Sequence, residues 1–160
     1  MVLEKIAKPL IQLIINEELN RNQFGFRPKS DCGLAKAMIF YKAKKYNYEK
    51  ALLIDIQKAY DTVNLDILTD IIEKTFNNIG KKKILNNFIK IYKGLILIIN
   101  GTEINMSRGL PQGSALSPLF FKLYINGVLK QINENNNTQG QAYADDMILQ
   151  GNNIDDIQKQ

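Results

Sequence analysis

Apolar and polar residues recur along this chain with two periods, which predicts a mixture of helices and strands. In residues 1–20 an apolar face at helical spacing predicts a first helix, which Pro9 either starts or kinks. That face consists of Ile6, Leu10, Leu13 and Ile14. An apolar run in residues 51–56, broken only by Asp55, predicts a strand buried on both faces. Further helices are expected at residues 30–45, 64–76, 81–92 and from 117 onward, with hairpins at 95–106 and 141–149.

Polar residues mark where several of these elements begin or turn. Ser30 and Asn64 are placed to cap the second and third helices, and Ser117 and Pro118 open the last one. Asn100-Gly101 between two apolar runs is typical of a type I′ hairpin turn. The expected order is helix, helix, strand, helix, helix, hairpin, helix, hairpin. This order predicts an α+β fold, with an antiparallel sheet covered on one face by helices.

Composition narrows the chemistry that the chain can perform. It contains 160 residues, no His and one Cys, which excludes histidine general-base catalysis and a structural zinc site. Any metal must therefore be held by oxygen ligands, as Mg²⁺ prefers. The net charge of +5 and the pI of about 9.2 make a polyanion a reasonable partner. The longest apolar run is too short to cross a bilayer and no signal peptide is evident. We therefore expect an intracellular protein, in the nucleus or the cytoplasm.

Two adjacent aspartates, Asp145 and Asp146, lie between the two apolar runs of the last hairpin. Adjacent carboxylates repel each other, and a divalent cation between them would remove the repulsion. The alternative is a solvated turn, since Asp favours turns. Asp55 sits in an apolar strand, where an ionised group needs a partner or a metal.

Basic residues suggest contacts with phosphates at two places. Arg27 and Lys29 lie in a loop rich in Gly and Pro, which could equally be a crossing anchored by two aromatic rings. Residues 81–83 are three lysines at the N-terminal end of a helix, where cations are disfavoured. They are placed either for a nucleic acid backbone or as a solvated basic face.

Four segments, in this order, resemble the reverse transcriptases, and among them the polymerases of non-LTR retrotransposons. Residues 22–28 (NQFGFRP) are similar to the segment ahead of the palm, and 53–64 (LIDIQKAYDTVN) to motif A. Residues 109–119 (GLPQGSALSPL) are similar to motif B, and 143–146 (YADD) to motif C. The motif B wording favours retrotransposons over group II introns, whose version usually carries a second Gly after the first.

The resemblance implies a polymerase palm in residues 51–160, preceded by a partial fingers segment in 1–50, with the fingers incomplete and the thumb absent. It implies that Asp55, Asp145 and Asp146 are catalytic and hold two Mg²⁺ ions, which Mn²⁺ can replace. The backbone of Ile56 would lie near the metal and the phosphates. The implied reaction adds deoxynucleoside triphosphates to the 3′-hydroxyl of a DNA primer on an RNA template, by two-metal-ion catalysis.

The resemblance also assigns binding residues. Tyr60 would lie under the sugar of the incoming nucleotide and collide with a 2′-hydroxyl, while Gln112 and Gly113 would line the nucleotide and template side. Tyr143 would touch the primer end, and Arg27 would join Lys29 in binding nucleic acid. The alternatives are an inactive retrotransposon remnant, a nucleic-acid-binding module without catalysis, and an RNA-dependent RNA polymerase, against which Tyr60 argues. Without the triphosphate clamp and the thumb, we expect the 160 residues alone to polymerise poorly or not at all, because positioning can account for about 7–11 kcal/mol of barrier lowering.

Overall fold

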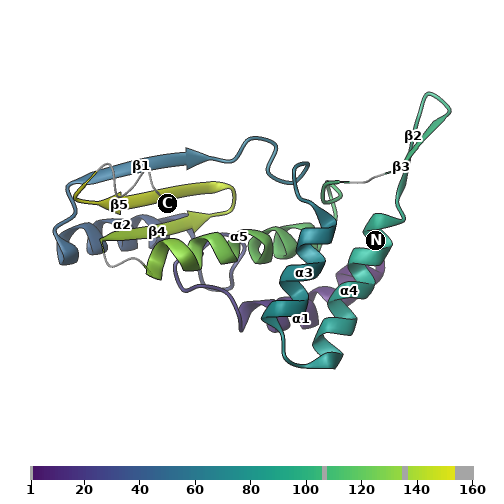
Figure 1. Cartoon of the computed structure of the whole chain (residues 1–160), viewed down its shortest axis with the longest axis horizontal. Helices are drawn as coiled ribbons and strands as arrows, with labels where there is room; N and C mark the ends of the chain where they lie inside the picture. The colour runs from purple at the N-terminus through teal and green to yellow at the C-terminus, as the bar shows by residue number, and fades with distance from the viewer. Residues whose placement is uncertain (1, 106–107, 135–136, 154–160) are drawn as a thin grey trace. The chain divides into compact units, whose positions relative to one another are not determined.

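The element order expected from the sequence is the order found. A computed structural model describes residues 2–105, 108–134 and 137–153 of the chain. Its elements are α1 (Val2–Asn16), α2 (Cys32–Tyr46), β1 (Lys50–Asp55), α3 (Leu65–Thr75), α4 (Ile79–Lys93), β2 (Ile96–Ile99), β3 (Thr102–Asn105), α5 (Ser117–Glu134), β4 (Thr138–Tyr143) and β5 (Asp146–Gly151) (Figure 1). The α+β class with an antiparallel sheet is confirmed. Among the helices of the described ranges, none is both long and apolar enough to span a membrane.

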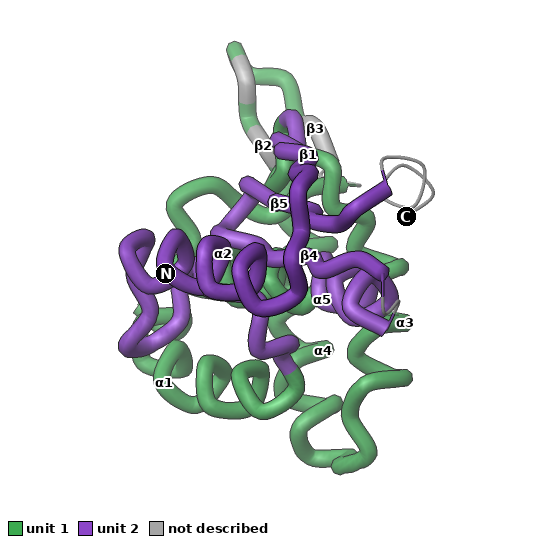
Figure 2. The backbone as a smooth tube through the Cα atoms, turned by 90° about the vertical axis from the view of Figure 1, so that its left-hand side faces the viewer, with its two compact units in different colours: residues 1–18, 58–124 green, residues 19–57, 125–160 purple. Residues whose placement is uncertain are grey.

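The chain divides into two compact units, each made of two separate stretches of sequence (Figure 2). The helical unit contains residues 1–18 and 58–124, and the sheet unit contains residues 19–57 and 125–160. Helix α5 therefore contributes its first half to the helical unit and its second half to the sheet unit. The 1–50 and 51–160 division follows sequence motifs instead of contacts, and it stays a prediction.

The sheet unit is built on three antiparallel strands in the order β1-β5-β4 (Figure 1). A Cβ added at Gly140 on β4 would meet the side chains of Leu129 and Ile132, so α5 packs closely against this face. Gln139 and Gln150 are next to Gly140 and its partner Leu149 in the two strands, so their side chains point to the opposite face of the sheet. Both form hydrogen bonds with α2. The helix cover is thus more extensive than the single face expected from the sequence.

Strand β1 is exposed along most of its length, so the prediction of a strand buried on both faces is wrong. Its pattern of burial is exposed at every position except Ile54, which is intermediate, and Leu53 is 79% exposed. Among the strands of the described residues, β1 pairs with β5 alone and is therefore an edge strand of this sheet, with packing neighbours on one side. Edge strands leave one row of backbone groups unpaired.

The helical unit packs α1, α3, α4 and the first half of α5 around an apolar core. Its buried side chains include Ile11, Ile14, Ile15, Leu65, Leu68, Ile72, Leu85, Phe88, Ile89, Leu119, Phe120 and Leu123. The face predicted for the first helix is mostly wrong, since Ile6, Leu10 and Leu13 are exposed and Ile14 alone of that set is buried. Pro9 does not start the helix but lies inside α1.

The predicted caps and turns are mostly confirmed. Asn64 caps α3, its side chain accepting hydrogen bonds from the backbone N–H groups of Asp66 and Ile67. Helix α2 is capped by Asp31 and not by Ser30, because the Asp31 carboxylate accepts from the N–H of Leu34 at 2.7 Å. The turn between β2 and β3 has φ of 51° and 79° at residues 100 and 101, as a type I′ turn requires.

Candidate active site

The sheet unit brings the three predicted catalytic aspartates to one end of its sheet. Asp55, the last residue of β1, is the register partner of Asp146, the first residue of β5. Residues directly opposite in an antiparallel pair point to the same face, with their Cβ atoms about 4.5–5.5 Å apart. Asp145 occupies the turn immediately before Asp146. Asp55 and Asp146 are both exposed, so the repulsion between their carboxylates is modest, and a cation bound between them would remove it.

The turn that carries Asp145 is tight and is tied to the neighbouring strand. Tyr143 pairs with Asp146, which leaves Ala144 and Asp145 as a two-residue turn, and Ala144 has a left-handed φ of 57°. The backbone N–H of Ile56 donates to the carbonyl of Asp145 at 3.4 Å. Motif A and motif C therefore meet through their backbones as well as through the ladder.

A loop from the segment ahead of the palm supports this turn. The Phe24 N–H donates to the Ala142 carbonyl at 2.8 Å, and the Ala142 N–H donates to the Asn22 carbonyl at 2.9 Å. A Cβ added at Gly25 would lie 2.2 Å from the backbone nitrogen of Ala144. Only glycine fits against the turn at this position. Sequence reasoning missed this role, although a Gly between two aromatic residues was its visible signal.

The donor set at this end of the sheet fits a hard divalent cation. Asp55, Asp145 and Asp146 offer only oxygen ligands, which suit Mg²⁺ and Mn²⁺. No three His, Cys, Asp or Glu side chains in the described part of the chain are arranged as a ready-made metal cage. Mg²⁺ commonly uses one or two carboxylates and completes its shell with substrate phosphates and water. The carboxylate pair of Asp55 and Asp146 provides that number of protein ligands.

The predicted nucleotide-binding residues outside the sheet meet in a cavity of the helical unit. Tyr60, Gln112 and Gly113 line this cavity of about 390 Å³, together with Pro111, Ser114, Ser117 and Pro118. The Tyr60 ring stacks on Phe121, with 5.1 Å between centroids, so its orientation is fixed by packing. The Gln112 amide donates to the Asp61 carboxylate at 3.2 Å.

Backbone bonds hold the motif B loop against the end of motif A. The N–H of Leu110 donates to the Tyr60 carbonyl and the N–H of Gly109 to the Val63 carbonyl, both at 2.8 Å. Gly109 has φ of 96°, and a Cβ there would lie 3.2 Å from the Asp61 carbonyl oxygen. These contacts explain why two segments some 50 residues apart form one cavity wall.

A buried polar cluster behind this cavity was not found from the sequence. The Tyr92 hydroxyl lies 2.7 Å from the Ser114 hydroxyl and 3.1 Å from the Glu4 carboxylate. Burial raises the pKa of Tyr92, and the Glu4 charge adds to the effect. The Ser114 oxygen also accepts from the N–H groups of Leu116 and Ser117. The cluster therefore fixes the loop that presents Gln112 and Gly113. Glu4 lies 88 positions from Tyr92 and 110 positions from Ser114 in the sequence, and no spacing rule links residues so far apart.

The other residues predicted to contact nucleic acid differ in their exposure to solvent and in the hydrogen bonds that their side chains already make. The Arg27 guanidinium donates to the backbone carbonyls of Asn20 and Gln23 at 3.1 and 3.3 Å, so it holds its own loop together. Lys29 is exposed, with a left-handed φ of 58°. Tyr143 is 36% exposed beside Asp146. Their roles toward nucleic acid stay predictions.

One further charged group is buried within the sheet unit. Lys42 on α2 is only 8% exposed, and its ammonium donates to the side-chain oxygens of Asn22 at 2.5 Å and Gln139 at 3.2 Å. Burial lowers the pKa of Lys42 to about 8, and the nearby Lys45 charge lowers it further. Nothing in the sequence distinguishes Lys42 from its exposed neighbours on α2. Lys42 joins the loop ahead of the palm to β4, which leads into the Asp145 turn.

Two yeast proteins are similar in sequence to most of this chain. The putative COX1/OXI3 intron 2 protein of Saccharomyces cerevisiae is 21% identical over 131 residues, which are 82% of this chain and 15% of the yeast protein. The putative COX1/OXI3 intron 1 protein of the same yeast is 22% identical over 126 residues, 78% of this chain and 14% of that protein. The chain thus spans about one seventh of the length of these relatives.

Solved structures with the same fold include telomerases. The apo telomerase of Candida tropicalis matches 97% of this chain and 32% of its own, with a TM-score of 0.65 and 15% identity. The telomerase of Candida albicans in complex with a TWJ fragment of telomeric RNA matches 94% of this chain and 31% of its own, with a TM-score of 0.64 and 12% identity. The family model described as reverse transcriptase (RNA-dependent DNA polymerase) matches residues 1–160. The chain belongs to the reverse transcriptase (RNA-dependent DNA polymerase) family.

Proposed function

We propose that this chain is the palm-bearing part of an RNA-directed DNA polymerase that adds deoxynucleotides to a primer 3′-hydroxyl with two divalent metal ions. Asp55, Asp145 and Asp146 would hold the ions. Such ions would supply the positive charge that lowers the pKa of the primer hydroxyl and that neutralises the triphosphate and the leaving pyrophosphate. The proposal includes an RNA template, a DNA primer and deoxynucleoside triphosphates as partners.

The chain's own residues supply positioning and leave the covalent chemistry to the substrates. The β1–β5 ladder sets the spacing of Asp55 and Asp146, and the packed loop at Gly25 fixes the turn that carries Asp145. Tyr60, held by its stack on Phe121, would limit the space available to a 2′-hydroxyl. Such fixed geometry is the main way in which polymerases and kinases lower their barrier.

The observation that carries the proposal is the pairing of Asp55 with Asp146 at the end of the sheet where Asp145 turns. Two exposed carboxylates in register, with a third next to them, repel each other and together offer oxygen ligands to a hard cation. A binding module without catalysis would not need them. The same module would bind RNA equally well after Asp55→Asn, and without Mg²⁺.

Single-nucleotide addition tests the proposal with the protein in excess over a DNA primer annealed to RNA. The expected result is Mg²⁺-dependent addition that Asp55→Asn and Asp145→Asn reduce at least about a hundredfold, the scale seen when one charge-stabilising group is removed. Asp70→Asn is the matched control, because Asp70 is an exposed carboxylate on α3. Addition that survives Asp55→Asn, or that needs no divalent metal, would contradict the proposal.

We further propose a non-LTR retrotransposon as the origin of the chain. The support is the motif B wording in residues 109–119. The yeast relatives are named as intron proteins, which makes an intron-borne element the competing origin. Sequencing the transcript on both sides of this coding region separates the two, because flanking intron sequence would contradict the retrotransposon origin.

A further inference from the structure

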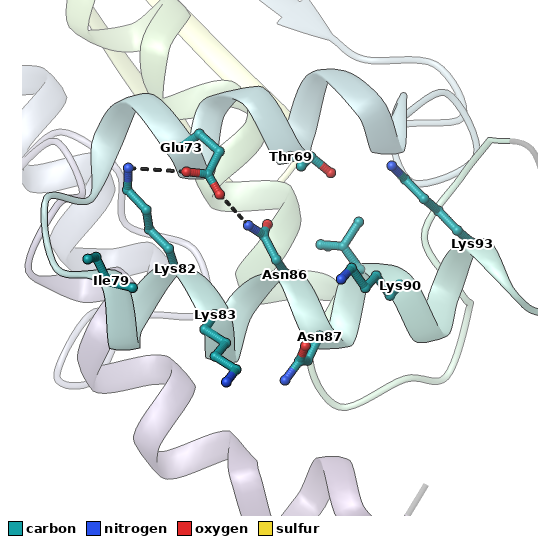
Figure 3. Close-up of a pocket in the computed structure, with 10 residues that line it drawn as sticks. Thr69, Glu73, Ile79, Lys82, Lys83, Asn86, Asn87, Lys90 and Lys93 are labelled. Atoms are coloured by element: carbon teal, nitrogen blue, oxygen red, sulfur yellow. Dashed lines mark hydrogen bonds and ion pairs between the residues drawn. The ribbon is translucent and has the colours of Figure 1, made fainter.

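A lysine-rich groove in the helical unit lies outside every site described above. Its volume is about 450 Å³, and it runs between α3 and α4 (Figure 3). Its lining includes Lys82, Lys83, Lys90 and Lys93, with Asn86 and Asn87 between them. We call these six residues the α4 lysine groove. All six follow the spacing of three or four residues that places side chains on one face of a helix.

Carboxylates neutralise part of the groove and leave part of it available. Glu73 of α3 pairs with Lys82 at 3.1 Å and accepts from the Asn86 amide at 2.6 Å (Figure 3). Lys93 pairs with Asp66 at 2.6 Å. Lys83 and Lys90 are exposed, and within the described residues no carboxylate lies within 4.0 Å of either ammonium. Two cations on one helix face therefore face solvent.

The helix dipole favours the lysines at one end of α4 and disfavours those at the other. Lys90 and Lys93 lie in the last turn, where cations are stabilising. The first turn of α4 contains no acidic residue, and its lysines oppose the positive end of the helix dipole. Its cap, Asn78, already satisfies the Lys81 N–H. Lys83 lies close to the first turn and has no carboxylate within 4.0 Å in the described part of the chain, so it gains most from a bound anion.

We propose that the α4 lysine groove binds the phosphate backbone of RNA, separately from the aspartate site. The groove is lined by lysine ammonium and asparagine amide groups, and none of its lining residues is aromatic, so it offers donors to phosphates and no surface for base stacking. Helix α4 has 15 residues and is therefore about 22 Å long, so the groove can follow several phosphates of one strand. The preference for RNA rests on the proposed function, whereas the affinity for phosphates does not.

Salt-dependent RNA binding by the whole chain tests this inference. Fluorescence anisotropy with a labelled single-stranded RNA compares the wild type with Lys83→Gln/Lys90→Gln. The matched control is Lys5→Gln/Lys8→Gln, which removes two exposed lysines of α1 and the same net charge. Losing two phosphate contacts should reduce the magnitude of the negative slope of log K against log salt by about 1.4. It should also weaken RNA binding roughly 10- to 30-fold at ~0.1 M salt. The control should change the slope by much less.

Lysine acetylation with and without RNA gives a second measurement that needs no variant. RNA should protect Lys83 and Lys90 and leave Lys5 and Lys8 reactive. Equal losses in the groove and control variants, or no protection of the groove lysines, would overturn the inference. The inference would also be overturned if Lys83→Gln/Lys90→Gln weakened binding to phosphatidylcholine vesicles containing phosphatidylserine and left RNA binding unchanged. Because these assays measure binding, loss of nucleotide addition in Asp55→Asn leaves their outcome unchanged, and the two proposals fail separately.

Discussion

Replacing Gly25 by alanine should loosen the turn that presents Asp145. The added Cβ would lie 2.2 Å from the backbone nitrogen and 2.9 Å from the Cα of Ala144, where ordinary contact begins at 3.4 Å. Both atoms are backbone, so no side-chain rotation can relieve the clash. Either the loop leaves β4 or the turn moves.

The size of the effect follows from the contacts at stake. Leaving β4 would break the two backbone hydrogen bonds between Ala142 and the loop at Asn22 and Phe24, each worth about 0.5–1.5 kcal/mol. Overpacking at tight sites costs about 1–3 kcal/mol, which agrees with that sum. For a chain of this length the corresponding fall in melting temperature is about 2–12 °C.

Hydrogen exchange and urea unfolding together measure this change. The Ala142 amide should exchange faster in Gly25→Ala, which reports the site even if the two units unfold separately. Gly127→Ala is the control, because a Cβ there meets nothing within 4 Å inside α5 and should stabilise by about 0.5–1 kcal/mol. A Gly25→Ala protein as stable as the wild type, with unchanged protection of Ala142, would refute the reasoning.

Four other predictions test separate parts of the structure. Folding lowers the pKa of Lys42 from 10.5 to about 8, so the unfolded state binds more protons than the folded state between these pH values. The free energy of unfolding, measured by urea titration, should therefore rise with pH over this window, and Lys42→Met should flatten the rise. Tyr92→Phe should cost about 0.5–1.5 kcal/mol per lost hydrogen bond, measured by thermal unfolding at pH 7. Asn64→Ala should cost about 1 kcal/mol by removing the α3 cap, and unchanged unfolding would contradict the cap. Tyr60→Ala should raise the use of ribonucleotides relative to deoxynucleotides by about tenfold or more in nucleotide addition, and an unchanged ratio would remove the proposed gate.

Local patterns predicted the elements because helix and strand periods, caps and turn residues act over a few positions. Asn64 and the turn at residues 100 and 101 are examples that the structure confirms. Burial was harder to predict, because it depends on the place of an element in the fold. The apolar run of β1 looks like a central strand, but the sheet order makes it an edge. Helix α1 carries apolar residues on two faces, and only packing decides that Ile11 is buried and Leu10 is exposed.

The candidate site shows the same division. Motif wording located Asp55, Asp145 and Asp146, and the register of β1 and β5 brings two of them face to face. The supports were invisible, because Gly25 acts through contact with a residue 119 positions away. The cluster of Glu4, Tyr92 and Ser114 likewise joins three distant segments. Spacing along the chain carries no information on such contacts.

Metal-directed backbone cleavage tests the central claim most directly. Fe²⁺ takes the place of Mg²⁺ and, with ascorbate and peroxide, cuts the chain next to the bound ion. We expect cuts near residues 55 and 145, suppressed by excess Mg²⁺ and lost in Asp55→Asn and Asp145→Asn but not in Asp70→Asn. Cleavage elsewhere in the chain, or cuts near residue 145 that persist in both aspartate variants, would contradict the claim that these carboxylates hold the metal.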